Sequence, residues 1–226
     1  MNVLALDGAL GAFSAAVARD DSIAAARSEA GNVALEHGLT LVESVLEAAR
    51  LQPQQIDRLA VGVGPGGFTG LRIAIAYAKS LAAAWERPLV PVCSFDLLEL
   101  DRRFERVLAV VVGRPGVISA RYRWNSGYRR SSGRIAQVLD ELFPDDAPLD
   151  STQGDSVGRD LEVVGAAKDV LDALAERAII VRSFDPAVTP AAAAAALLAS
   201  SRAPAKSVHE VRADYGELPA AKPSRF

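Results

Sequence analysis

The spacing of apolar residues along the chain predicts an alternating α/β protein. Short apolar runs at residues 2–6, 13–19 and 22–30, separated by turn residues, are typical of strands. Between residues 35 and 49 apolar side chains recur at steps of three and four, which predicts an amphipathic helix. Its predicted core stripe consists of five residues, Leu35, Leu39, Val42, Leu46 and Ala49. The apolar run 56–63 then predicts a strand that is buried on both faces.

The rest of the chain continues the alternation. A loop at residues 64–70 leads into a predicted helix at 71–85, a strand at 89–93 and a helix at 96–104. Later strands are predicted at 107–112, 117–124, 161–164 and 178–181, and later helices at 134–143, 168–177 and 191–201. The polar, proline-containing end, 213–226, is predicted to fray. We expect a mixed sheet with crossovers and two domains, 1–100 and 101–226.

Composition excludes several classes of protein. Half of the 226 residues are hydrophobic, which is ordinary for a globular chain, and a net charge of −3 offers no overall basic field for a phosphate backbone. Cys93 is the single cysteine, so no internal disulfide is expected. The alanine-rich run 191–198 is shorter than the roughly 20 residues that a bilayer span needs. We expect a soluble, cytoplasmic protein with no membrane contact.

The most specific stretch is residues 59–79, LAVGVGPGGFTGLRIAIAYAK, a predicted buried strand that runs through glycines into a helix. Glycines permit positive φ and close backbone approach, and a helix start can hold an anion. The stretch contains the spacing Gly-x-Gly-x-x-Gly at residues 62–67, but Pro65 removes a donor and no acidic residue ends the next strand. Leu71 and Arg72 stand where a P-loop requires lysine and a hydroxyl residue. Turn chemistry alone favours a tight corner without a ligand over an anion site.

The same stretch resembles the signature GPGSFTGLRIG of the TsaB (YeaZ) family. The matching loop residues are Gly64, Pro65, Gly66, Gly67, Phe68, Thr69, Gly70 and Arg72. Glycine replaces the family's serine at 67, and Ala74 replaces its last glycine. Shorter matches at residues 4–7, 36–38, 78–82 and 92–95 lie in family order, so the resemblance covers about residues 3–100. Beyond residue 100 the family's Asp-Ala-Arg-x-Gly-Glu-x-Tyr segment is replaced by GRPGVISA.

This resemblance implies two ribonuclease-H-like lobes of the actin, sugar-kinase and chaperone-ATPase superfold, with mixed sheets and flanking helices. It implies a non-catalytic subunit in tRNA threonylcarbamoyladenosine formation, paired with a TsaD-like catalytic subunit. A TsaE-like ATPase would dock on the pair, tRNA would be reached only through the complex, and the chain alone would form a homodimer. No catalytic residue, cofactor or metal ligand is expected in this chain.

Neither His37 nor Asp7 stands in a sequence pattern that indicates catalysis. His37 has no second histidine one helical turn away, and His209 is distant in sequence, so a two-histidine metal site is not indicated. Asp7 stands where an actin-like ATPase carries an aspartate, but only backbone donors follow it, which favours a turn-capping role. The competing class is a small-molecule kinase or metallopeptidase-like hydrolase of the same superfold.

If the chain resembles TsaB, its partner surface is expected on the exposed sides of the two N-terminal helices. The first helix would contribute Leu41 and Val45, outside the predicted core stripe, and His37 as a surface or interface residue. The second helix would contribute small and charged side chains, namely Arg72, Ala76, Lys79 and Ala83. Small residues let a facing helix approach closely, although alanine also suits any helix.

Overall fold

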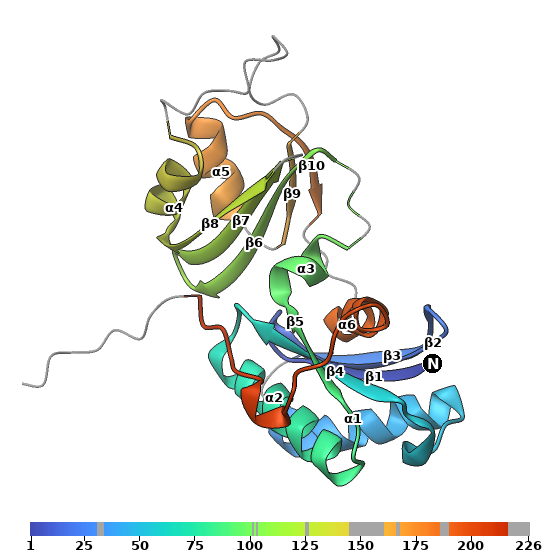
Figure 1. The fold of residues 1–226 in the computed structure, drawn as a ribbon. Coiled ribbons are helices and arrows are strands. Elements are labelled where there is room, and N and C mark those ends of the chain that lie inside the picture. The colour runs from blue at the N-terminus through green and yellow to red at the C-terminus, as the bar shows by residue number, and fades with distance from the viewer. Residues whose placement is uncertain are drawn as a thin grey trace, which may run out of the picture.

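The chain forms two lobes, each built on a five-stranded mixed sheet with flanking helices (Figure 1). The structure, a computed structural model, describes residues 1–30, 34–100, 102, 104–124, 127–144, 161–165, 168–185 and 190–216. The fold class predicted from the sequence is confirmed. No helix within these ranges combines the length and the apolar character that a membrane span requires.

The first sheet has the strand order β3-β2-β1-β4-β5. Its strands are β1 (Asn2–Asp7), β2 (Ala12–Arg19), β3 (Ser22–Ala30), β4 (Arg58–Gly64) and β5 (Leu89–Cys93). Strand β1 is central, antiparallel to β2 and parallel to β4. Its Leu4 and Leu6 point into one core cluster and Val3 and Ala5 into another. Both faces of β1 are therefore buried, which explains its continuous apolar run.

Helices from opposite ends of the chain cover this sheet. Helices α1 (Ala34–Ala49) and α2 (Phe68–Ala84) lie on one face, and α6 (Ala191–Ala199) lies on the other (Figure 1). Helix α6 is almost entirely alanine, so its backbone can approach the sheet closely. Helix α6 packs on the first sheet although it lies beyond residue 100. The division of the chain into domains 1–100 and 101–226 therefore stays a prediction.

The second sheet has the order β10-β9-β6-β7-β8, and α4 (Ile135–Leu142) and α5 (Lys168–Glu176) pack on one of its faces. Its strands are β6 (Arg106–Arg114), β7 (Val117–Trp124), β8 (Gly127–Arg134), β9 (Leu161–Val164) and β10 (Val181–Asp185). The sequence did not predict strand β8, because its residues, GYRRSSGR, show no apolar alternation. The predicted strand at 178–181 was wrong, because Ala178 has a positive φ of 56° and belongs to the turn after α5.

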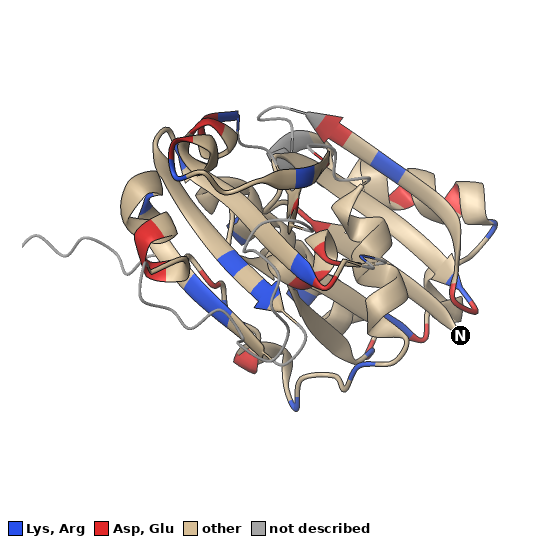
Figure 2. Cartoon of the chain, turned by 90° about the horizontal axis from the view of Figure 1, so that it is seen from above, with Lys and Arg blue, Asp and Glu red and all other residues tan. Residues whose placement is uncertain are grey.

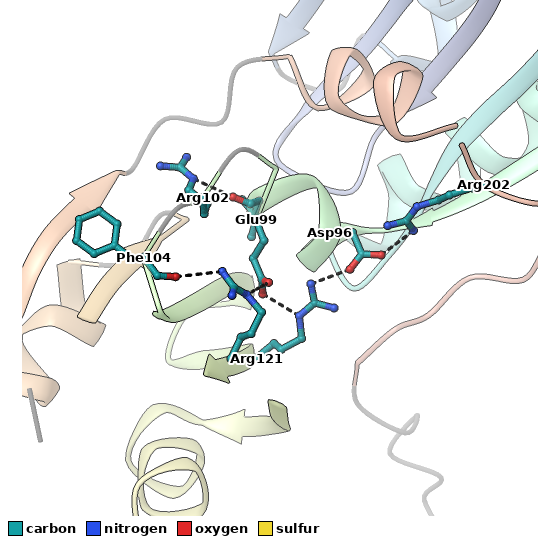
Figure 3. A network of polar contacts seen from close by, with 8 residues as sticks. Asp96, Glu99, Arg102, Phe104, Arg121 and Arg202 are labelled. Atoms are coloured by element: carbon teal, nitrogen blue, oxygen red, sulfur yellow. Dashed lines mark hydrogen bonds and ion pairs between the residues drawn. The ribbon is translucent and has the colours of Figure 1, made fainter. Parts of the chain in front are cut away.

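Short helix α3 (Ser94–Leu98) lies at the junction of the two lobes and ends well before residue 104, where the sequence predicted its end. Its Asp96 accepts hydrogen bonds from Arg121 of β7 and from Arg202 after α6, both at 2.7 Å (Figure 3). The next acid, Glu99, accepts from Nε of Arg121 and of Arg123, both at 2.8 Å. These five side chains, which we call the junction network, link the second sheet to the first lobe.

Burial would raise the pKa of Asp96, but hydrogen bonds from Arg202 and Arg121 outweigh burial and hold that pKa below its ordinary value. The ionised carboxylate therefore stabilises the folded protein at every pH above the ordinary aspartate pKa of about 4. This contribution is lost as the pH falls through the lowered pKa.

We predict that Asp96→Asn lowers the free energy of unfolding by about 1–3 kcal/mol at pH 7, because two partly buried arginines lose their shared charge. The difference from the wild type should shrink as the pH falls below about 4. Denaturant titrations over this pH range measure it. Asp140→Asn is the matched control, since Asp140 pairs with Arg177 at 66% side-chain exposure and surface pairs contribute less than about 1 kcal/mol. Equal losses in both variants would contradict the assigned role of the junction network.

Candidate functional site

Two glycine-containing loops meet at the carboxyl ends of β1 and β4. The amide of Gly67 donates to the carbonyl of Ala9 at 2.8 Å. A Cβ added at Gly66 would lie 2.2 Å from the same carbonyl oxygen, and one added at Gly8 would lie 2.3 Å from the carbonyl oxygen of Gly70. The family-motif loop, Gly64 to Gly70, is therefore packed against residues 8–9 of the first hairpin. This contact supports the tight corner over an anion site.

Positive φ matters at one position of this loop only. Gly64 has a φ of 97°, whereas Gly66, Gly67 and Gly70 are not in the left-handed region. Helix α2 also begins at Phe68, three residues earlier than predicted, so Phe68, Thr69 and Gly70 form its first turn. The glycines of the motif thus serve close backbone approach more than unusual dihedral angles.

Asp7 ends β1 and is completely buried. Its Oδ1 accepts from the amides of Ala9 at 3.1 Å and Leu10 at 3.3 Å, which confirms the predicted turn-capping role. Its Oδ2 is buried and has no hydrogen-bond partner among the described residues. A Cβ at position 62 would lie 1.8 Å from that oxygen, so Gly62 is what leaves room for it. Burial raises the pKa of Asp7 to about 7, although the amides of Leu10 and Ala9 favour the charged form.

Residues 211–216, which we call the crossing segment, pass from the first lobe to the second beside the motif loop (Figure 1). The amide of Asp214 donates to the carbonyl of Val63 at 2.7 Å, and its carboxylate pairs with Arg130 of β8 at 2.7 Å. A Cβ added at Gly216 would lie 2.1 Å from the Ser119 hydroxyl oxygen on β7. The predicted fraying was therefore wrong for residues 213–216, and residues 217–226 lie outside the described part of the chain. Local sequence gave no signal for these contacts because all of them are long-range.

Arg72 of the motif joins the crossing segment to the start of α2. Its guanidinium lies 3.6 Å from the ring centroid of Phe68, and its Nε donates to the Tyr215 hydroxyl at 2.9 Å. Phe68 is 54% exposed, and Arg72 is also exposed. These three side chains, the Arg72 cluster, form an aromatic and cationic surface on the first lobe.

The structure corrects the predicted partner surface on α1. Leu41 and Val45 were expected outside the core stripe, but they are 6% and 0% exposed, whereas Leu39 of the predicted stripe is 48% exposed. Helix α1 packs against α2 as well as against the sheet, so its buried side is wider than one stripe and includes the side that faces α2. Gly38 marks this contact, since a Cβ there would lie 2.4 Å from the Tyr77 ring.

The other predicted surface residues lie at the outside of the first lobe. His37 is exposed, and its Nδ1 lies 3.5 Å from Glu29 of β3. On α2, Ala76 and Ala83 are exposed and Lys79 is half-buried. Their contact with a partner stays a prediction.

Comparison with known proteins identifies the family. The family model described as "TsaD: tRNA N6-adenosine threonylcarbamoyltransferase" matches residues 30–209. TsaB from Bacillus subtilis is 26% identical over 64% of this chain and 61% of its own length. TsaB from Escherichia coli is 31% identical over 52% of this chain and 53% of its own length. The chain belongs to the TsaD family, and within it the chain is similar to TsaB (YeaZ) proteins.

Structural comparison extends the likeness over nearly the whole chain. YeaZ from Pseudomonas aeruginosa superposes with a TM-score of 0.70 and covers 95% of this chain and 99% of its own, at 21% identity. This member of the family therefore shares the YeaZ fold in both lobes, including the second lobe, where the sequence motifs depart. In sequence, the matches span a little over half the length of the two TsaB relatives.

We predict that Gly66→Val lowers the free energy of unfolding by about 2–4 kcal/mol, because the new Cβ collides with the Ala9 carbonyl. Gly67→Ala is the matched control, since its Cβ would lie an ordinary 3.7 Å from the same oxygen. Thermal melting compares the two. Similar melting temperatures for Gly66→Val and the wild type would show that the motif loop can shift away from the Ala9 carbonyl, and that this close contact does not stabilise the turn between β4 and α2.

We also predict that Asp7 makes stability depend on pH. Between about pH 4 and pH 7 the unfolded chain has lost the Asp7 proton while the folded protein retains it. The free energy of unfolding should therefore fall as the pH rises through this window, by at most about 1.4 kcal/mol per pH unit from this group. Asp7→Asn removes that slope and keeps the oxygen that accepts from Ala9 and Leu10. Denaturant titrations from pH 4 to pH 8 should show the variant gaining stability relative to the wild type; a constant difference would show that Asp7 ionises normally in the folded protein.

Proposed function

We propose that this chain acts in the formation of threonylcarbamoyladenosine in tRNA, as a non-catalytic subunit paired with a TsaD-like catalytic subunit. The observation that carries the proposal is the TsaD family match over residues 30–209, together with two relatives named as tRNA threonylcarbamoyladenosine biosynthesis protein TsaB. Because the aligned parts span only part of those relatives, the role is inferred from the shared family and from the geometry described above.

The lobe junction supports a non-catalytic role. In a kinase of this superfold, the backbone amides after the first strand would face a phosphate. Here the amides of Ala9 and Leu10 are held by Asp7, and the carbonyl of Ala9 is held by the motif loop. The crossing segment also runs between the motif loop and β7. These internal contacts give no specific support to the kinase or hydrolase alternative.

The partner surface that we propose lies on the outward sides of α1 and α2. Its residues are His37, Leu39, Phe68, Arg72, Ala76, Lys79 and Ala83, with Leu39 and Phe68 replacing the buried Leu41 and Val45. Exposed large apolar side chains together with exposed alanines on this pair of helices suit a closely packed helix-on-helix contact. The further partners that the family likeness suggests are a TsaE-like ATPase on the pair and, without a TsaD-like subunit, a second copy on the same surface.

Ala76→Arg tests this surface, because it places a long charged side chain where a facing helix would pack. We expect association with the TsaD-like subunit to weaken at least tenfold, measured by light scattering after size exclusion and by titration of one subunit into the other. The melting temperature should stay unchanged because Ala76 is exposed.

Ala175→Arg is the matched control, since Ala175 is an exposed helical alanine on α5 of the other lobe. Loss of association in the Ala76 variant alone supports the surface. Unchanged association in both variants would place the interface elsewhere, and no association of the wild type would reject the pairing itself.

A further inference from the structure

Arginine is concentrated in one part of this acidic chain. Residues 106–134 contain no Asp or Glu, and they contain seven arginines, Arg106, Arg114, Arg121, Arg123, Arg129, Arg130 and Arg134, whereas the whole chain has a net charge of −3. Strands β7 and β8 carry five of the seven, and Figure 2 shows blue bands along neighbouring strands of this lobe. At physiological salt the Debye length is about 8 Å, so only acids close to these strands offset this charge, and Glu141 of α4 is one of them, since its carboxylate accepts from the Ser131 hydroxyl of β8.

Some of these arginines already have a structural partner. Arg121 and Arg123 bind the acids of the junction network, and Arg130 binds Asp214 of the crossing segment. Arg129 and Arg134 differ from them, because both are exposed and neither pairs with an acid among the described residues. Within the described part of the chain, Arg129 and Arg134 of β8 therefore form no ion pair with an acid.

These charges lie on the outer strand of the second sheet, next to exposed aromatic surface. Among the described strands, β8 pairs with β7 alone. Tyr128 is 65% exposed, and the Arg129 guanidinium lies 5.9 Å from the ring centroid of Trp124. From Tyr128 to Arg134 the strand extends over six residue steps, roughly 20 Å at about 3.3 Å per residue. Side chains alternate along the strand, so Tyr128 and Arg134 lie on one face of the sheet and Arg129 on the other, and a ligand that contacts all three must follow the outer edge of β8. We call Tyr128, Arg129 and Arg134 the basic edge.

The exposed arginines of β8 also have an explanation that requires no ligand. Arginine on an outer strand discourages strand pairing between copies. That explanation does not account for the 65% exposure of Tyr128, whose ring has the Arg121 guanidinium 5.7 Å from its centroid and still presents most of its surface to solvent. Arginines for phosphates and aromatic rings for unstacked bases are the combination with which proteins bind single-stranded regions of RNA.

We propose that the basic edge binds RNA, with Arg129 and Arg134 contacting backbone phosphates and Tyr128 stacking on an exposed base. The RNA would be the tRNA substrate, and this identification rests on the proposed function. The chain then contacts tRNA directly, in contrast to the expectation from the family resemblance that tRNA is reached only through the complex.

The test uses the complex of this chain with its TsaD-like subunit and a fluorescent, unmodified tRNA transcript, with binding followed by anisotropy at several salt concentrations. Arg129→Ser combined with Arg134→Ser should weaken binding at least tenfold near physiological salt. The slope of log K against log salt should become shallower by about 1.5, since each phosphate contact contributes about 0.7–0.9. Tyr128→Ala should weaken binding and leave the slope unchanged, because stacking releases no counterions.

Arg182→Ser is the matched control, since Arg182 is an exposed arginine on β10, the opposite outer strand of the same sheet. An assembled complex in which the double variant binds tRNA with wild-type affinity and slope overturns the inference and leaves the proposed function intact. If no complex forms, the same tRNA titration is carried out on the chain alone. Weaker binding by the double variant then supports RNA binding at the basic edge without the proposed function. Unchanged or absent binding rejects both the RNA inference and the proposed function. If the double variant instead abolishes a homodimer seen by light scattering, the edge pairs with a second copy and the RNA inference is wrong.

Discussion

Strand β1 requires cover on both of its faces, and much of the tertiary structure depends on this requirement. Its side chains alternate between two core clusters, so a helix layer on one face alone would leave Val3 and Ala5 in water. The second face is covered by α6, which comes from the far end of the chain. The chain must therefore traverse the second lobe and return before the first lobe is complete.

This return explains the lobe junction. After α6, Arg202 reaches the junction network and the crossing segment runs along the motif loop to Arg130. The two lobes are thus linked by buried or half-buried charge pairs at α3 and by the crossing segment beside β7 and β8. A junction held at both places suits a subunit that presents a fixed surface more than one whose lobes open and close around a substrate.

Net charge is a poor guide to the surface of this protein. A value of −3 excluded an overall basic field, yet the acids and arginines are not evenly mixed. Folding satisfies Arg121, Arg123 and Arg130 with acids from other elements and leaves Arg129 and Arg134 exposed on β8. Only the folded arrangement distinguishes arginines that stabilise the junction from arginines that remain available to a partner.

From the sequence alone one can predict the succession of strands and helices in the first lobe, the motif loop and the capping role of Asp7, because these depend on local periodicity and on residues close in sequence. The sequence also carried the family resemblance through the glycine motif. It could not reveal β8, whose polar residues lack alternation, or the ordered crossing segment, whose contacts join residues far apart in sequence. The buried side of α1 was misjudged for a related reason: periodicity shows that a helix has an apolar face, but only the packing of α2 beside it decides that Leu41 and Val45 are inside and Leu39 is outside.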